Sequence, residues 1–208
     1  MDVETMTESD AIERALGEIA RRLTDSGASW VVGGSAGLML RGIALPRPPR
    51  DLDIYADVGD CGLIHERLAA YATDKPVRSV TAIYESLLSH YEIAGVAVEL
   101  VGGFVVSANE GRYEVKVPDG LLKDAEWLKL GGTEAAPVRV PLVPLAHELW
   151  FNRLRGRADR FELVAAVMAE QPDRHEPALR RLEAANRLTT EAAAGVHARL
   201  RARAEGGR

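Results

Sequence analysis

Two aspartates separated by a single residue, Asp51 and Asp53, constrain the folding of this chain more than any other feature of its sequence. They alternate with the apolar residues Leu52 and Ile54, which is the pattern of a half-buried β-strand. In such a strand both carboxylates point to one face. Two carboxylates on one face repel each other unless a positive charge lies between them, and oxygen-rich sites of this kind suit Mg²⁺. The pair therefore predicts a strand with a core side and a metal-binding side.

A turn of small residues, Gly33-Gly34-Ser35, lies upstream between a short apolar segment at 30–32 and a helical pattern at 35–40. Backbone N–H groups at the start of a helix bind phosphate, glycine permits its close approach, and the Ser35 hydroxyl can donate as well. A phosphate-binding turn together with a metal site indicates nucleotide chemistry.

Glu99 is the third candidate, because it interrupts an otherwise apolar run at 96–101. A glutamate inside a central strand is costly unless it is paired or bound to a metal. If this strand lies beside Asp51 and Asp53, three carboxylates converge. The alternative is an edge-strand glutamate that faces water. Glu92 competes for the same role, but its more polar neighbours favour solvent exposure.

The order of predicted elements gives the fold class. Apolar periodicity predicts helices at 9–26, 35–40 and 61–71, strands at 30–32, 52–56, 90–93, 96–101, 104–106, 112–117 and 138–143, and further helices at 144–156, 158–170, 177–187 and 190–203. This order predicts an α+β fold in which a mixed twisted sheet with packed helices is followed by a C-terminal helical segment. We place the boundary between an α/β core at 1–143 and the helical segment at 144–208.

Composition limits the classes of protein to which the chain can belong. No apolar run reaches the ~18 residues of a membrane helix and no secretion signal is visible, so we expect a cytoplasmic protein without a membrane partner. The net charge of −5 argues against general affinity for nucleic acid. Residues 174–208 nevertheless carry eight Arg against four Glu. This excess is either a solvated helical face or a basic patch for a polyanion such as RNA, or for an acidic partner.

Other reactive residues fit known sites less well. The single cysteine, Cys61, excludes an intrachain disulfide and a cysteine-based zinc cluster, and it has no evident base partner. The five histidines lack the spacing of metal ligands. Ser35 lacks the G-x-S-x-G order of a hydrolase nucleophile.

Taken together, the hydrophobic-Gly33-Gly34-Ser35 turn, the Asp51-Leu52-Asp53-Ile54 strand and the later strand carboxylate Glu99 resemble the polymerase-beta-like nucleotidyltransferase superfamily. The match spans residues 30–101. It is most similar to small bacterial stand-alone members, which include aminoglycoside and lincosamide nucleotidyltransferases and abortive-infection toxin enzymes. The spacer from Gly34 to Asp51 is longer than in the family pattern, and its extra length falls in a proline-rich loop.

The resemblance implies a role for each of these positions. Asp51 and Asp53 would hold two Mg²⁺ ions with Glu99 completing the site, and residues 33–35 would bind the nucleoside triphosphate. It also implies a basic residue on the helix after the sheet, for which Arg153, Arg157 and Arg160 are candidates for a triphosphate contact or for the surface.

Arg47 and Arg50 flank the Asp pair, where they either stabilise phosphate charge or keep the loop soluble. We choose Arg50 as a nucleotide-binding candidate.

The implied activity is Mg²⁺-dependent transfer of a nucleoside monophosphate from an NTP to a hydroxyl acceptor on a small molecule, an RNA or a protein. Glu99 could serve as the general base. The alternative is a domain of the same fold that binds a nucleotide or a partner without catalysis.

Overall fold

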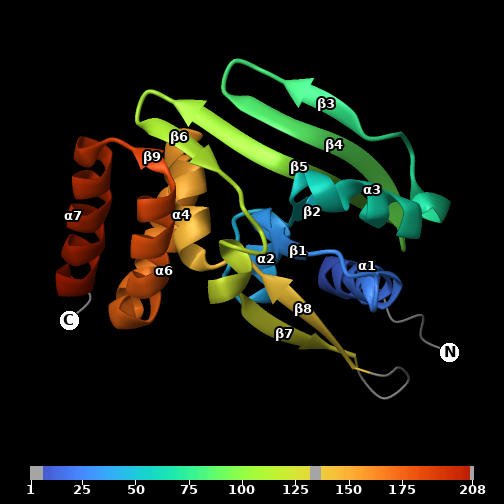
Figure 1. Cartoon of the computed structure of the whole chain (residues 1–208). Helices are drawn as coiled ribbons and strands as arrows, with labels where there is room; N and C mark the ends of the chain where they lie inside the picture. Colours follow the sequence, from blue (N-terminus) through green and yellow to red (C-terminus); the bar gives the residue numbers. More distant parts are fainter. Residues whose placement is uncertain (1–6, 132–136, 207–208) are drawn as a thin grey trace, which may run out of the picture.

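A mixed β-sheet forms the centre of the molecule, for which the computed structural model describes residues 7–131 and 137–206 (Figure 1). The strands are β1 (Trp30–Gly33), β2 (Asp51–Ala56), β3 (Val77–Val80), β4 (Tyr84–Ile93), β5 (Val96–Ala108), β6 (Gly111–Glu114), β7 (Glu126–Leu130), β8 (Val138–Leu142) and β9 (Arg187–Leu188). Their order is β3-β4-β5-β2-β1-β8-β7. Outside this series, β6 pairs with both β5 and β9. β2 pairs in parallel with β5 and antiparallel with β1, so the sheet is mixed as the sequence predicts.

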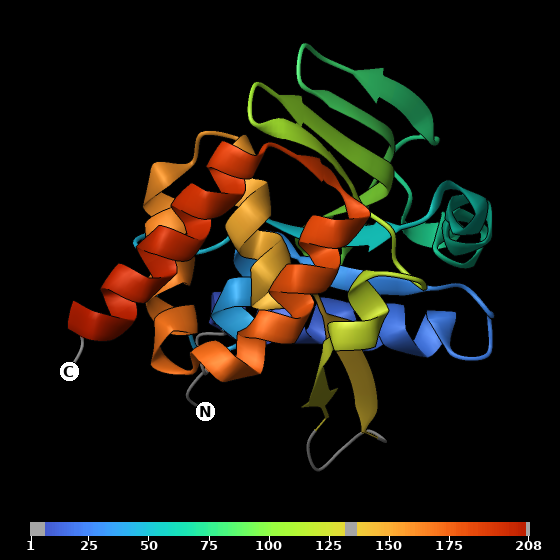
Figure 2. The same cartoon turned by 60° about the vertical axis from the view of Figure 1, so that its left-hand side comes forward.

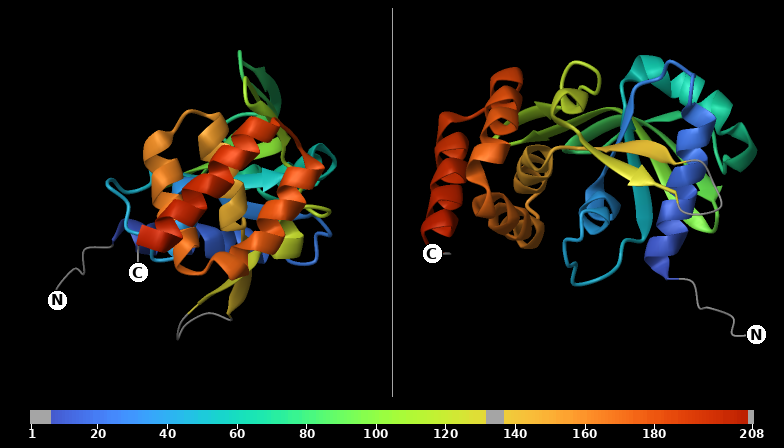
Figure 3. Two further views of the ribbon diagram at one scale, coloured as in Figure 1. Left: turned by 90° about the vertical axis from the view of Figure 1, so that its left-hand side faces the viewer. Right: turned by 90° about the horizontal axis from the view of Figure 1, so that it is seen from below.

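Helices cover both faces of this sheet. They are α1 (Glu8–Leu23), α2 (Gly34–Leu40), α3 (Val58–Arg67), α4 (Leu145–Leu154), α5 (Ala158–Glu170), α6 (Pro172–Ala185) and α7 (Thr190–Gly206), with 3₁₀ turns η1 (Ala69–Tyr71) and η2 (Leu121–Asp124). Seen from below, α1 and α3 lie on one side of the sheet and the C-terminal helices on the other (Figure 3). The predicted α+β fold class is therefore confirmed.

The period of two in β1 and β2 divides the core into two clusters. Val32, Leu52 and Ile54 pack with the apolar face of α1 and with α3. Val31 and Tyr55 point to the opposite face and pack with α4 to α7. Asp51 and Asp53 share the face of Tyr55, so the sheet directs both carboxylates toward the C-terminal helices.

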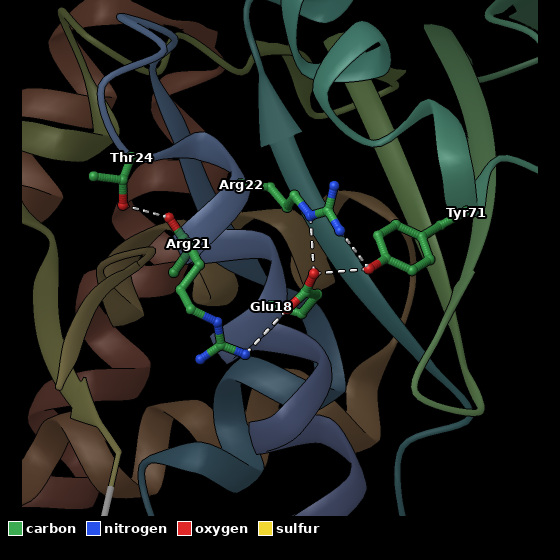
Figure 4. A network of polar contacts seen from close by, with 6 residues as sticks. Glu18, Arg21, Arg22, Thr24 and Tyr71 are labelled. Carbon is green, nitrogen blue, oxygen red and sulfur yellow. Dashed lines mark hydrogen bonds and ion pairs between the residues drawn. The ribbon is translucent and has the colours of Figure 1, made fainter. Parts of the chain in front are cut away.

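Two local contacts fix α1. Thr7 caps its start, because the Thr7 hydroxyl accepts the N–H of Asp10 and the Asp10 carboxylate accepts the N–H of Thr7. Near its end, the Glu18 carboxylate accepts hydrogen bonds from Arg22 at 2.9 Å and from the Tyr71 hydroxyl at 2.7 Å (Figure 4). This network ties α1 to the 3₁₀ turn η1 that follows α3.

A long hairpin, β4–β5, supports the predicted position of Glu99. Ala94 and Gly95 form its turn with φ of 54° and 77°, as the primed hairpin turns require. β5 lies between β4 and β2, and its register sets Glu99 directly opposite Asp53. The strand that carries Glu99 is therefore central, and the edge-strand alternative is wrong.

Three predictions of local structure are wrong. The segment at 104–106 is not a separate strand but the continuation of β5. The sequence pattern missed β3 and β7, because each is an edge strand without a regular apolar alternation. The helix predicted at 177–187 begins earlier, because Pro172 rather than Pro177 takes the favoured proline position at its start.

The C-terminal helices pack together against one end of the sheet, where the orange and red ribbons stack side by side (Figure 2). Residues of α4 to α7 share one hydrophobic cluster with Val31, Tyr55 and Val101 of the sheet. The boundary placed between 143 and 144 remains a prediction from composition. Among the helices of the described residues, none combines the length and the apolar character needed to cross a membrane.

Candidate active site

A cavity of about 340 Å³ lies where the carboxylate face of the sheet meets α4 and the start of α5. Asp51 and Asp53 of β2 and Glu99 of β5 line it together. Asp53 and Glu99 are direct partners in the parallel register, which brings neighbouring strands to about 4.8 Å. The sheet thus brings the three carboxylates predicted from the sequence to one cavity.

A fourth carboxylate, Glu148 of α4, completes this acidic floor. Burial, and then the charges of Asp51, Glu99 and Glu148, raise the pKa of Asp53 from 3.8 to about 8. Burial is the main cause that raises the pKa of Glu99, and the negative charge of Asp51 adds to it. The acids therefore create negative potential in the cavity that the adjacent cations offset only in part.

The donor set fits a divalent cation. Carboxylate oxygens are the ligands that Mg²⁺ and Mn²⁺ prefer, and neither Asp51 nor Asp53 forms an ion pair within the described residues. Glu99 has only a distant partner, the Nε2 atom of His90 at 3.9 Å. Within residues 7–131 and 137–206, however, no group of three His, Cys, Asp or Glu side chains is arranged closely enough to hold a metal ion. A bound ion would have to draw the carboxylates together.

The glycine turn lies against the acidic floor, and each glycine is required for a different reason. A Cβ at Gly33 would lie 2.3 Å from the Tyr55 ring. Gly34 adopts φ of 66°, and a Cβ there would lie 2.0 Å from the Oδ2 atom of Asp53. Gly34 and Ser35 line the cavity, whereas Gly33 packs behind it. The sequence predicts that the N–H groups of this turn are free to bind phosphate. The N–H of Gly34 is not free, because it donates to Glu148 at 2.7 Å.

Three arginines form a basic wall opposite the carboxylates. Arg155, Arg157 and Arg160 line the cavity at the junction of α4 and α5. The Nε atom of Arg155 donates to the Tyr84 hydroxyl at 3.0 Å, and its guanidinium lies over the Phe151 ring. Two nitrogens of Arg160, Nε and Nη1, are buried without a hydrogen-bond partner in the part of the chain that the structure describes. The wall therefore has capacity to bind an anion.

Two predicted arginines lie elsewhere. Arg50 is exposed and lines a separate hollow beside α1 together with Arg47, so its predicted contact with the nucleotide has no support in the geometry. Arg50 lies in the bend before β2, outside the strand that directs Asp51 and Asp53 to the cavity. Arg153 turns away from the cavity and pairs with Glu110 at 2.5 Å.

Hydroxyl groups of the β3–β4 hairpin form the remaining wall. Ser79, Thr81, Tyr84 and Ser86 line the cavity on this side. Ser79 and Ser86 are cross-strand partners. This wall is neutral and polar, unlike the acidic floor and the basic wall.

Three residues on or just after α4 were not predicted from the sequence as part of the site. Glu148, Asn152 and Arg155 all line the cavity. They are spaced by four and three residues, which places them on one helical face. This polar stripe on a mostly buried helix is a signal that the sequence contained. The hairpin hydroxyls gave no such signal, because β3 was not predicted.

His147, the buried histidine of α4, packs in the core. Burial, then the charges of Arg155 and Arg41, lower the pKa of His147 to about 3, so its ring is neutral. Its Nδ1 atom lies 2.9 Å from the Tyr113 hydroxyl and its ring stacks on Phe151. His147 thus fills the core beneath the acidic floor.

Comparison with known proteins supports the fold. A crystal structure of a proposed nucleotidyltransferase from Thermotoga maritima matches with a TM-score of 0.58 and 23% identity over 82% of this chain and 100% of that chain. The chain has the nucleotidyltransferase-like fold. No family model and no curated protein matches the sequence.

Two adenylyltransferase-type structures match less well. ANT(2'')-Ia in complex with adenylyl-2''-tobramycin has a TM-score of 0.44 and 13% identity over 79% of this chain and 94% of its own. The lincosamide antibiotic adenylyltransferase LnuA, bound to lincomycin, has a TM-score of 0.43 and 12% identity over 77% of this chain and 98% of its own. The fold assignment rests on the Thermotoga maritima structure.

Most of the arginines at 174–206, the described part of the arginine-rich segment, are paired with acids. Arg199 and Arg203 both pair with Glu162, and Arg181 pairs with Asp124. Arg174 and Arg180 pair with Glu126 and Glu176, so five of the seven arginines at 174–206 have an acidic partner. An RNA partner is therefore not supported, and the alternative of a solvated helical face fits the structure.

Proposed function

We propose that this protein is a metal-dependent nucleotidyltransferase that moves a nucleoside monophosphate from an NTP to a hydroxyl acceptor. The observation that carries the proposal is the convergence of Asp51, Asp53 and Glu99 on one cavity, opposite a wall of three arginines. The nucleotidyltransferase-like fold supports it. A cavity with an acidic floor and a basic wall suits a substrate that carries both metal-bound and free phosphate oxygens.

Asp51, Asp53 and Glu99 would hold the divalent cations. Such ions lower the pKa of an acceptor hydroxyl and neutralise charge on a leaving pyrophosphate. The raised pKa of Asp53 supports this assignment, because a buried carboxylate among like charges gains most from a nearby cation.

The remaining side chains position the substrates and take up the proton. In the proposed reaction, the acceptor oxygen forms a bond to the α-phosphorus and the bond from that phosphorus to pyrophosphate breaks. Glu99 would accept the hydroxyl proton, because its carboxylate lines the cavity beside the Asp pair. Arg155 and Arg157 would bind the phosphate oxygens.

The test is pyrophosphate release with each NTP, Mg²⁺ and a panel of hydroxyl acceptors. We expect Asp53→Ala to abolish release while the circular dichroism spectrum is retained. Asp173→Asn, an exposed acid on α6, is the matched control and should keep full activity. A fully active Asp53→Ala protein would rule out the mechanism.

A second candidate is a domain that binds a nucleotide or a partner without catalysis. One observation favours it: within residues 7–131 and 137–206, no three carboxylates are arranged closely enough to hold a metal ion. Calorimetry with Mg²⁺ and several NTPs separates the two functions. Tight nucleotide binding without pyrophosphate release from any acceptor would favour the binding domain.

A further inference from the structure

The buried carboxylate of Glu148 joins two elements that are far apart in the sequence. Its side chain is 1% exposed and lines the cavity from α4. The Oε1 atom accepts the N–H of Gly34 at 2.7 Å, and the Nδ2 atom of Asn152 lies 3.3 Å from Oε2. A short hydrogen bond shielded from water is electrostatically stronger than the same bond at the surface. Glu148 therefore fixes the position of the glycine turn.

Gly34 in turn lies directly against Asp53. Its φ of 66° is a left-handed conformation that side-chain-bearing residues rarely adopt, and a Cβ there would lie 2.0 Å from the Oδ2 atom of Asp53. The backbone of the turn thus fills the space on one side of the Asp53 carboxylate. If the turn moved, that carboxylate would gain room to rotate.

The hydrogen bond between Gly34 and Glu148 limits what the turn can bind. A backbone N–H has one proton, and at Gly34 Glu148 already accepts it. This N–H is therefore not available to a phosphate oxygen. The guanidinium groups of Arg155, Arg157 and Arg160 line the same cavity and can bind phosphate instead.

We propose that Glu148 is a positioning residue that holds the Gly34 turn against Asp53, so that in this chain the turn orients a metal-binding carboxylate and its Gly34 N–H does not bind phosphate. The inference rests on the proposed function, because it assigns a metal to Asp53. It adds a residue from the C-terminal helices that acts on the carboxylate pair through the glycine turn.

The test measures metal and polyphosphate binding separately. Mn²⁺ binding is followed by electron paramagnetic resonance in the wild type, Glu148→Gln and Glu148→Ala, with Glu92→Ala on the exposed side of β4 as the control. Binding of a non-hydrolysable NTP is measured by calorimetry in EDTA. The Gln side chain keeps an oxygen that accepts the Gly34 N–H, whereas Ala has none.

We expect Glu148→Ala to weaken Mn²⁺ binding at least tenfold, and Glu148→Gln to remain within about threefold of the wild type. Metal-free NTP binding in Glu148→Ala should be at least as tight as in Glu148→Gln, because both variants lack the acid and only the Ala variant frees the Gly34 N–H. Wild-type affinity for Mn²⁺ in Glu148→Ala overturns the inference. Equal loss in Gln and Ala variants also overturns it, because Glu148 would then be a ligand itself. Weaker metal-free NTP binding in Glu148→Ala than in Glu148→Gln also overturns it, because the positioned turn would then be binding phosphate.

Failure of the proposed function gives a different result: a chain that binds Mn²⁺ but releases no pyrophosphate loses the transferase function and keeps the inference, whereas a wild type that binds no Mn²⁺ overturns both. A second variant covers the case in which Glu148→Ala does not fold. Gly34→Ala should displace Asp53 and weaken Mn²⁺ binding at least tenfold. Gly37→Ala on the same helix meets only ordinary contacts at 3.5 Å and is its control. Unchanged Mn²⁺ affinity in Gly34→Ala overturns the inference.

Discussion

Asp53 lies among three other carboxylates in the cavity, and its environment differs from that of a surface acid. Burial and the charges of Asp51, Glu99 and Glu148 raise its pKa from 3.8 to about 8. In the folded, metal-free protein this side chain therefore keeps a proton that the unfolded chain loses near pH 4. Its environment links the charge of one residue to the stability of the whole chain.

We predict that Asp53→Asn stabilises the metal-free protein more at pH 9 than at pH 5. Because the folded state binds the extra proton between about pH 4 and pH 8, wild-type stability falls over that range and levels off above it. The amide does not titrate, so its advantage should grow by about 4 kcal/mol from pH 5 to pH 9, because stability falls by about 1.4 kcal/mol per pH unit up to the folded pKa of about 8. Thermal unfolding across this pH range in EDTA measures the difference. A pH-independent difference would contradict the raised pKa.

Gly33 has a packing role that is distinct from the role of Gly34. A Cβ at Gly33 would lie 2.3 Å from the Tyr55 ring, which is itself packed in the core. We expect Gly33→Ala to lower the free energy of unfolding by about 1–3 kcal/mol through overpacking. Gly62→Ala in α3, where nothing lies within 4 Å, is the matched control and should be neutral or stabilising. Urea denaturation gives both values, and equal effects would refute the packing role.

At the scale of elements, α4 determines the chemistry of the cavity as much as the sheet does. One face of this helix places Glu148 and Asn152 at the acidic floor, and Arg155 just after its end joins the basic wall. The neighbouring residue Arg153 points away and pairs with Glu110. The helix therefore separates a cavity-facing arginine from a structural one.

We predict that Arg155→Ala weakens NTP binding by about tenfold, roughly 1.4 kcal/mol, through loss of a charge-assisted contact. Arg153→Ala should leave NTP affinity unchanged, because Arg153 does not line the cavity. Fluorescence titration with a labelled NTP measures both. Equal losses in the two variants would indicate a general electrostatic effect and would argue against a specific phosphate contact.

At the scale of the whole molecule, the sheet and the C-terminal helices share one hydrophobic cluster. Val31, Tyr55 and Val101 of the sheet pack with Trp150 of α4 and Val164 of α5. A change of composition near residue 144 marks where strands give way to helices. Such a change in the sequence pattern does not by itself show that either part folds alone.

We therefore predict one cooperative unfolding transition for the full chain. A chain truncated after residue 143 should lose its fold, because removal of the helices exposes the Tyr55 side of the core. Calorimetry of the full chain tests the first expectation. The chemical-shift dispersion of amide protons in the NMR spectrum of the truncated chain tests the second. Two separate transitions, or a folded truncated chain, would instead support the boundary drawn from composition.

The sequence by itself determined the strand with Asp51 and Asp53, the glycine turn before α2 and the β4–β5 hairpin, because period-two alternation and turn chemistry are local properties. Only the tertiary structure decided that Glu99 stands opposite Asp53, that Arg50 points away, and that Glu148 binds Gly34 from 114 residues later. Strand register and helix packing are non-local, so no window of sequence contains them. The carboxylate pair was readable in advance, whereas the residues that orient it were not.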